Sequence, residues 1–87
     1  MAKYKLVFKK SVAKDLRKIP KPDVQRILKK IAGLAEDPRG EGCLKLSGLE
    51  LYRVRLGVYR IIYEIRDNEL IISVIKISHR SGVYKRA

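Results

Sequence analysis

Three arginines stand close together in the segment YRVRLGVYR (residues 52–60), as Arg53, Arg55 and Arg60. If the GV dipeptide in this segment forms a two-residue turn, the flanking strands pair as a hairpin with Arg55 directly opposite Arg60. Like charges opposed in this way cost a few tenths of a kcal/mol, up to about 1 kcal/mol. A bound phosphate reverses the sign, because guanidinium forks match phosphate oxygens. The pattern therefore indicates phosphate binding.

A second group of chemically capable side chains follows near the C-terminal end, in HRSGVY (residues 79–84). It contains His79, the only histidine, together with Arg80 and Tyr84. Taken singly, a histidine beside an arginine is typical of an exposed surface without a function, and the tyrosine is typical of a side chain packed in the core. Beside three arginines on a neighbouring strand pair, they indicate a site that grips RNA and stacks a base.

Alternation along the hairpin separates an apolar face from a cationic face. The arginines and Glu64 fall on one face, and a register slip of one residue would bury arginines. The apolar set on the other face comprises Tyr52, Val54, Leu56, Tyr59, Ile61, Tyr63 and Ile65. The sequence leaves an alternative equally open, in which the arginines only solvate an exposed sheet face, with Glu64 as a partial partner.

Two helices are predicted ahead of the hairpin. Ser11 is a candidate N-cap for the first, which places Val12, Leu16 and Ile19 at helical spacing. The segment IPKPD ends that helix, because proline disfavours helical geometry in the residue before it. Pro22 suits the first turn of the second helix, whose apolar stripe runs from Val24 to Ala35 before Pro38 ends it.

Strands account for most of the remaining sequence. Short runs of strand-forming residues with period-two alternation predict strands over residues 4–8, 51–56, 59–65 and 70–77, with a loop at 38–48 that contains a short strand near 44–46. The order β-α-α-β-β-β predicts an α+β domain spanning residues 1–87. In it a helical hairpin packs on one face of a small, mainly antiparallel sheet.

Charge is the strongest bulk signal, since 21 lysines and arginines against nine acidic residues give a net charge of +12. This excess predicts a polyanionic partner, nucleic acid before an acidic protein, and a membrane surface last. Cys43 is the only cysteine, which excludes an intramolecular disulfide and a cysteine-based zinc site. No segment is apolar for long enough to span a membrane. We expect a soluble cytoplasmic protein with no metal, cofactor or membrane partner.

Two segments, KLSGLELYRVRLGVYRIIYEI and ISHRSGVY, resemble the RelE/ParE superfamily of toxins from type II toxin–antitoxin systems. The similarity covers essentially the whole chain. The central pattern is specific to the superfamily, whereas the HRxxVY ending points to its RelE branch of ribonucleases. The resemblance implies the RelE-like fold of the microbial ribonuclease type.

The activity that the resemblance implies is that of an mRNA interferase, a metal-independent endoribonuclease that cuts mRNA in the ribosomal A site and halts translation. The RNA 2′-hydroxyl attacks the adjacent phosphate. Arg60 matches the arginine that contacts the scissile phosphate, Arg80 the one proposed to support the leaving oxygen, and Tyr84 the tyrosine that stacks on the substrate. Arg53 and Arg55 lie where RelE toxins place basic residues on the strand.

The sequence departs from that family pattern at Arg53 and Arg55, where well-studied RelE enzymes have lysines, one of them a proposed general base. A guanidinium holds its proton too tightly for that role. Either these arginines act only through charge or another group is the base, and His79 is the better acid–base candidate. Lys45 precedes the LSG turn as a further candidate RNA contact, although a solvated lysine explains it equally simply.

Two alternative functions remain at this point: a ParE-like inhibitor of DNA gyrase, and a non-catalytic basic RNA-binding module. Every toxin reading implies a cognate acidic antitoxin of the RelB kind, with operator DNA bound only through the antitoxin. Ribosome docking is expected to use cations of the helical hairpin, namely Lys14, Arg17, Lys18, Lys21, Arg26, Lys29 and Lys30.

Overall fold

The computed structural model describes residues 3–40, 42–46 and 50–79, and in them two helices precede four of the five strands. The elements are β1 (Lys5–Phe8), α1 (Lys10–Arg17), α2 (Lys21–Leu34), β2 (Leu44–Lys45), β3 (Leu51–Leu56), β4 (Tyr59–Arg66) and β5 (Ile71–His79). The order matches the predicted β-α-α-β-β-β, with the expected short strand near residues 44–46 present as β2.

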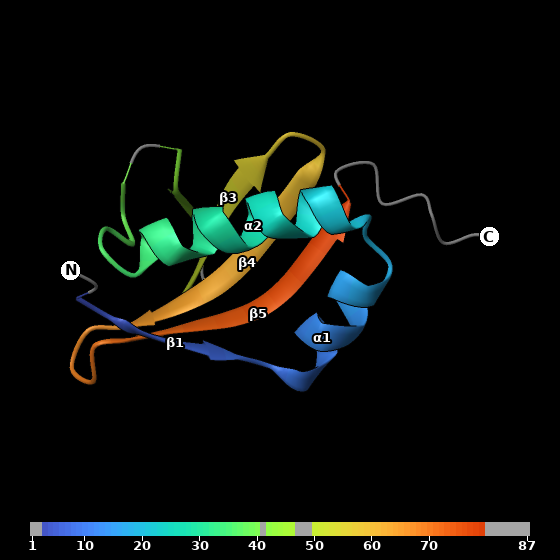
Figure 1. The fold of residues 1–87 in the computed structure, drawn as a ribbon. Helices are drawn as coiled ribbons and strands as arrows, with labels where there is room; N and C mark the ends of the chain where they lie inside the picture. Colours follow the sequence, from blue (N-terminus) through green and yellow to red (C-terminus); the bar gives the residue numbers. More distant parts are fainter. Residues whose placement is uncertain (1–2, 41, 47–49, 80–87) are drawn as a thin grey trace.

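The five strands form one sheet in the order β1-β5-β4-β3-β2. Only β1 runs parallel to its neighbour, β5, and the other pairs are antiparallel. Both helices lie on the same side of the sheet, with α2 across the strands and α1 beside β5 (Figure 1). The predicted α+β architecture, with a helical hairpin on one face of a mainly antiparallel sheet, is confirmed.

The register of the β3–β4 hairpin is the one that the apolar pattern predicts. Leu56 pairs with Tyr59, and Arg55 pairs with Arg60. The turn between the strands is made possible by Gly57, whose φ of 59° lies in the left-handed region that costs glycine nothing. Pairing in this register puts most of the apolar side chains of both strands on the face that the helices cover.

That face carries the hydrophobic core. Tyr63 and Ile61 of β4 are fully buried, and so are Ile27 and Ile31 of α2, which lies above them. The core cluster comprises Val12, Ile27, Ile31, Leu34, Val54, Ile61, Tyr63, Ile72, Val74 and Ile77. Because the helices cover one face alone, the opposite face of the sheet is left for other uses. None of the helices in the described part of the chain is long and apolar enough to cross a membrane.

The helix boundaries differ from the predicted ones in two places. Helix α1 begins at Lys10 with Lys9 as its N-cap, so the prediction of Ser11 as the cap is wrong. The Ser11 hydroxyl instead donates to the Ile75 carbonyl of β5, at 3.5 Å. Helix α2 has its proline in the first turn, as predicted, but ends at Leu34, four residues before Pro38, with the buried Ala35 as its C-cap.

Helix α1 compensates for the short β1, which pairs with β5 only as far as Phe8 and Val74. Beyond that point β5 has an open edge. The Asp15 carboxylate of α1 accepts a hydrogen bond from the backbone N–H of Ile77, at 3.2 Å. A side chain thus satisfies a strand donor that has no neighbouring strand on that side.

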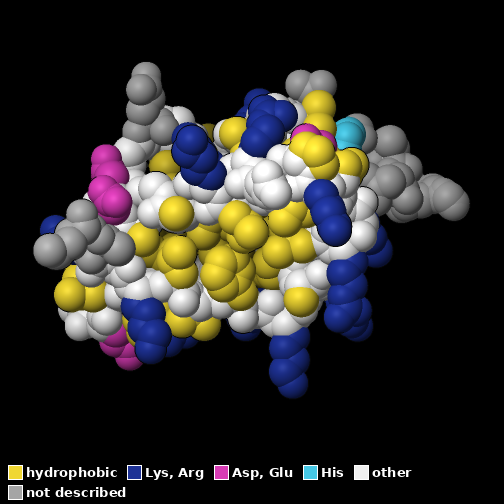
Figure 2. All heavy atoms as spheres, viewed as in Figure 1, with side chains coloured by type: hydrophobic (Ala, Val, Ile, Leu, Met, Phe, Trp, Pro, Cys, Tyr) yellow, Lys and Arg dark blue, Asp and Glu magenta, His cyan; other side chains and the backbone are white. Residues whose placement is uncertain are grey.

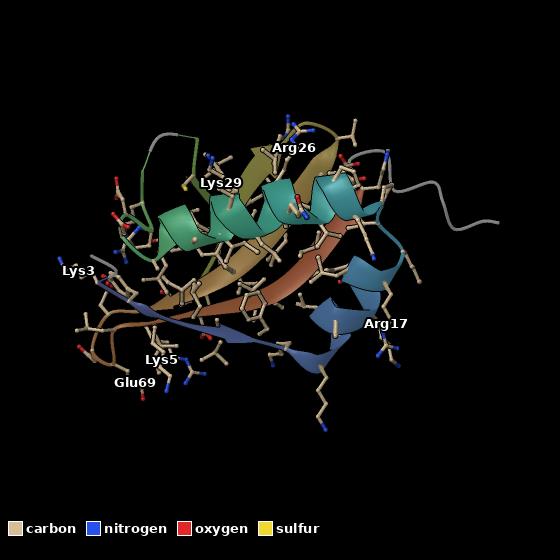
Figure 3. All side chains as sticks on the ribbon, viewed as in Figure 1. Lys3, Lys5, Arg17, Arg26, Lys29 and Glu69 are labelled. Atoms are coloured by element: carbon tan, nitrogen blue, oxygen red, sulfur yellow. The ribbon has the colours of Figure 1, made fainter. Side chains whose placement is uncertain are left out.

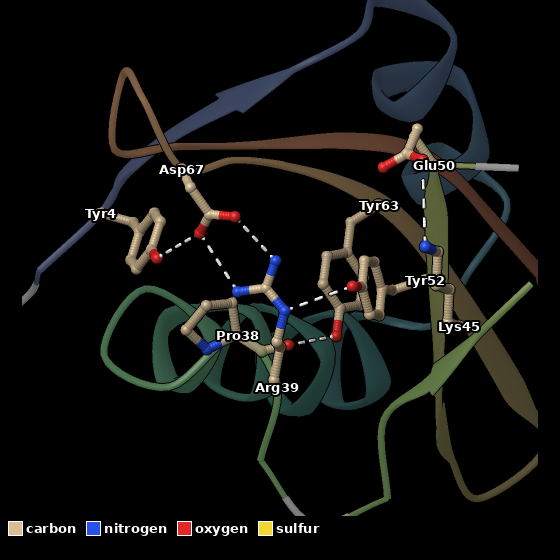
Figure 4. A network of polar contacts seen from close by, with 8 residues as sticks. All are labelled: Tyr4, Pro38, Arg39, Lys45, Glu50, Tyr52, Tyr63 and Asp67. Carbon is tan, nitrogen blue, oxygen red and sulfur yellow. Dashed lines mark hydrogen bonds and ion pairs between the residues drawn. The ribbon is translucent and has the colours of Figure 1, made fainter.

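A polar network joins the loop after α2 to the sheet (Figure 4). The Arg39 guanidinium donates to both carboxylate oxygens of Asp67, at 3.1 and 2.8 Å, and Tyr4 donates to the same carboxylate at 2.8 Å. Arg39 also donates to the Tyr52 hydroxyl at 3.2 Å, while the buried Tyr63 hydroxyl donates to the Pro38 carbonyl at 2.6 Å. These contacts fix the loop against one end of the sheet, where β1 and β3 begin and β4 ends.

The network makes the stability of the protein sensitive to acid. Hydrogen bonds from Arg39 and Tyr4 lower the pKa of Asp67 to about 2, from an ordinary 3.8. A carboxyl with a depressed pKa stabilises the fold above its ordinary pKa and loses that contribution as the pH falls through about 2. We expect Asp67→Asn to reduce the free energy of unfolding near neutral pH, with the deficit shrinking as the pH falls from about 4 toward 2.

Urea unfolding at a series of pH values measures this difference. Glu36→Gln is the matched control, because Glu36 is exposed and makes no ion pair within the described residues. A deficit in Asp67→Asn that stays constant down to pH 2 would contradict the assignment of the effect to the ionised carboxylate.

Candidate nucleic-acid interface

The face of the sheet opposite the helices, the outer face, gathers the arginines in two adjacent rows. Directly paired residues share a face, so the register defines both rows. The turn row, next to the β3–β4 turn, consists of Arg55, Arg60 and Ser78. The middle row consists of Leu44, Arg53, Ile62 and Lys76. Four cations from three strands thus lie within two rows of one another.

The guanidinium groups are partly embedded in the sheet surface. Arg53 and Arg60 are half-buried, and Arg55 is exposed. The Nε atoms of Arg53 and Arg60 are shielded from water, and the Nε of Arg53 has no hydrogen-bond partner among the described residues. An atom that water cannot reach is also closed to a phosphate oxygen, so a ligand would have to contact the terminal nitrogens of these guanidinium groups.

Within the described residues, Glu64 pairs with neither Arg53 nor Arg55. It accepts a hydrogen bond from Arg66 at 3.2 Å, and Arg66 also pairs with Glu69 at 3.4 Å. Within the part of the chain that the structure describes, no ion pair joins a carboxylate to Arg53 or Arg55. The alternative in which Glu64 is a partial partner is therefore wrong for Arg53 and Arg55, whose positive charges have no carboxylate partner among the described residues.

Lys76 was missed by the sequence analysis. If β4 and β5 paired regularly from the turn that joins them, Lys76 would lie opposite Ile61 and point into the core. An irregularity of register between Ile62 and Tyr63 shifts the pairing by one residue, and Lys76 pairs with Ile62 on the outer face. A β-bulge is hard to read from sequence, because nothing in a run such as LIISVIKIS marks the extra residue. A lysine inside an apolar strand was the one available signal.

Lys45 does not join the arginines. It pairs with Tyr52, which places it on the helix-covered side of the sheet, and its ammonium lies 3.9 Å from the Glu50 carboxylate. Figure 4 shows this pair at the sheet edge, beside the Arg39 network. As a candidate RNA contact, Lys45 thus lies away from the two rows.

His79 also lies on the helix-covered side. It pairs with Tyr59, and their rings meet edge to face with centroids 5.9 Å apart. The Tyr59 hydroxyl donates to Asp23 at 2.8 Å, which raises the pKa of Tyr59. Both rings line a cavity of about 470 Å³ between α1 and β5, together with Asp15, Lys18, Ile19, Lys76 and Ile77. Arg80 and Tyr84 lie outside the described residues.

The helical side of the molecule presents a second basic surface. Arg26 and Lys29 lie on the side of α2 that faces Leu56 of β3, with the Arg26 guanidinium close to Gly57 of the β3–β4 turn, and Arg17 projects from α1 (Figure 3). Between α2 and β1, Figure 2 shows a band of hydrophobic side chains at the surface, with lysines and arginines around it. Leu28 on α2 is 41% exposed. An apolar band bordered by cations suits a partner protein that carries acidic side chains beside apolar ones.

The comparisons with known proteins agree with this architecture. The family model described as the ParE toxin of type II toxin-antitoxin system, parDE, matches residues 6–84. RelE1 of Methanocaldococcus jannaschii is 32% identical over 87 residues, which cover 95% of this chain and 97% of that protein. The mRNA interferase toxin RelE of Escherichia coli strain K12 is also 32% identical, over 97% of this chain and 93% of its own length.

The same result comes from a solved structure. This protein superimposes on a chain of the crystal structure of the archaeal RelE–RelB complex from Pyrococcus horikoshii OT3, with a TM-score of 0.82 and 31% sequence identity. The alignment covers 93% of this chain and 99% of that one. Both named relatives and the structural neighbour are RelE proteins rather than ParE proteins. This chain therefore belongs to the RelE/ParE superfamily of type II toxin–antitoxin toxins, on its RelE branch.

Proposed function

We propose that this protein is an mRNA interferase, the toxin of a type II toxin–antitoxin system, which cleaves mRNA in the ribosomal A site. The observation that carries the proposal is the outer face, where Arg53, Arg55 and Arg60 lie in adjacent rows and no described carboxylate pairs with the first two. The naming of the Escherichia coli relative as an mRNA interferase supports it. A cationic, open sheet face suits an extended single strand of RNA.

The proposed reaction needs little covalent chemistry from the protein. The 2′-hydroxyl of one nucleotide attacks the adjacent phosphorus, the bond to the 5′-oxygen breaks, and the products are a 2′,3′-cyclic phosphate and a 5′-hydroxyl. Because the nucleophile belongs to the substrate, the protein acts by positioning and by stabilising the extra negative charge of the phosphorane. Arg60 and Arg55, paired directly across the hairpin, are placed to do both.

The acid–base role of His79 is weakened by its position. A phosphate bound to Arg60 on the outer face would lie on the opposite side of the sheet from the imidazole, which contacts Tyr59. We propose that Arg53 and Arg55 act through charge, and that His79 contributes by holding the end of β5, from which residues 80–87 continue. Arg80 and Tyr84 remain proposed for the leaving oxygen and for base stacking.

The proposed partners follow from charge and from the relatives. Solved RelE structures include complexes with RelB, and a net charge of +12 calls for an acidic partner. We propose an acidic RelB-like antitoxin, with operator DNA bound only through it, and ribosomal RNA as the partner of the basic helical side. We propose a cytoplasmic location, because the proposed targets are the ribosome and mRNA.

Primer extension on mRNA in a translating extract tests the function. We expect cuts within codons that require ribosomes, are absent on free mRNA, and are lost in Arg80→Ala. Purified DNA gyrase assayed in parallel covers the ParE-like alternative. Absence of cleavage by folded wild-type protein would overturn the proposal. Gyrase inhibition, or RNA binding without cleavage, would then identify which alternative function holds.

A further inference from the structure

We propose that the middle row is a second phosphate-binding subsite, in which Lys76 and Arg53 hold the RNA phosphate next to the one bound by the turn row. This inference rests on the proposed RNA-cleaving function and adds to it a residue, Lys76, and a direction for the RNA. The two subsites together would orient the backbone along strand β4 rather than across the sheet.

The spacing of the rows supports two consecutive phosphates. Arg60 and Ile62 are two residues apart on β4 and mark the turn row and the middle row. Strands rise 3.2–3.4 Å per residue, so the rows are roughly 6.5 Å apart. That separation is of the same order as the distance between neighbouring phosphates in single-stranded RNA. Cations within one row lie on different strands and would hold a single phosphate from its two sides.

The other residues of the middle row, Arg53, Ile62 and Leu44, also suit an RNA phosphate and its neighbouring ribose or base. Arg53 is half-buried and makes no ion pair with a carboxylate among the described residues. Ile62, half-buried, lies between Arg53 and Lys76, and Leu44 at the end of the row is 53% exposed. Apolar surface between two cations offers a contact for a ribose or a base while the charges bind the phosphate.

Lys76 is available for such a contact. It is exposed and makes no ion pair within the residues described. It borders the cavity that Asp15 also lines, and no ion pair joins the two side chains. Because β1 ends at Phe8, no strand among the described residues pairs with the edge of β5 at this point. A lysine ammonium is a compact charge that binds phosphate without a fixed orientation, so its flexible stem is no obstacle.

The salt dependence of RNA binding tests the subsite. The probe is a short single-stranded oligonucleotide with 2′-O-methyl groups, which binds but lacks the attacking hydroxyl. Each phosphate neutralised contributes about 0.7 to the slope of log association constant against log salt for a single strand. We expect Lys76→Gln to reduce the magnitude of that slope by about 0.7 and Lys76→Arg to leave it unchanged.

Lys5→Gln is the matched control. Lys5 is an exposed lysine of β1 that pairs with Ile71, far from the two rows. The substitution removes the same charge as Lys76→Gln, so the slope should stay at its wild-type value. Thermal unfolding of each variant checks that the fold is retained. Titrations begin at low salt, where the wild-type protein is expected to bind measurably.

Several results would overturn the subsite. They are an unchanged slope in Lys76→Gln, an equal loss in Lys5→Gln, no binding by the wild-type protein, or a Lys76→Gln defect confined to antitoxin binding. These outcomes are separate from failure of the proposed function. Loss of slope without ribosome-dependent cleavage would refute the nuclease and keep the subsite, and cleavage with an unchanged slope would do the reverse.

Discussion

Arg60→Ala is expected to slow ribosome-dependent mRNA cleavage by about 100- to 1,000-fold, the usual cost of removing one preorganised group that stabilises transition-state charge. Arg60 lies in the turn row opposite Arg55, where a scissile phosphate would meet two guanidinium groups. Arg60→Lys keeps the charge but loses the planar fork, so an intermediate rate is expected. The rate is measured by primer extension on purified ribosome complexes under single-turnover conditions.

Arg66→Ala is the matched control for this prediction. Arg66 is on the same strand and the same face as Arg60, but it is already engaged by Glu64 and Glu69. Removing it should change the cleavage rate little, and exposed pairs of this kind contribute little to stability. Equal losses in Arg60→Ala and Arg66→Ala would mean that total charge, rather than position in the turn row, governs cleavage.

Ile61→Ala is expected to destabilise the fold by about 2–5 kcal/mol, because it leaves a cavity under α2. Ile61 is 0% exposed and belongs to the core cluster. The matched comparison is Ile62→Ala, which removes the same atoms from the neighbouring residue. The Ile62 side chain lies on the outer face and is only half-buried. Ile62→Ala should therefore cost clearly less. Urea unfolding monitored by circular dichroism measures both variants.

A similar loss in the two isoleucine variants would contradict the division of β4 into a core face and an outer face. The comparison also separates stability from binding. Ile61→Ala should weaken RNA binding only where it unfolds the protein. Ile62→Ala should weaken binding by a folded protein, since Ile62 lies between Arg53 and Lys76 in the middle row.

Local sequence was sufficient for the hairpin at the centre of the site. A two-residue turn leaves few registers, and slipping by one residue would place arginines in the core, so alternation alone fixed Arg55 opposite Arg60. The helical hairpin could also be predicted from the sequence, because Pro22 and the apolar stripe of α2 are local signals. The N-cap of the first helix could not. The first helix begins one residue before Ser11, whose hydroxyl contacts Ile75, a partner 64 residues away.

The wider site required the tertiary structure. A bulge between strands β4 and β5 decides which residues of β5 face outward, and it placed Lys76 among the arginines and His79 beside Tyr59 on the other side. Glu64 was a plausible neighbour of the arginines by alternation, yet Arg66 holds it. Lys45 is near the arginines in sequence, but its pairing with Tyr52 turns it away from them.

The sequence by itself determined the charge of this protein, its order of elements and the β3–β4 register, because all three depend on composition or on contacts between near neighbours. Tertiary structure alone decided which cations share a face across several strands. That outcome depends on the bulge, which sets how the residues of β5 align with those of β4. Side-chain alternation carries information along one strand, and a single shift of register between strands is enough to invert it.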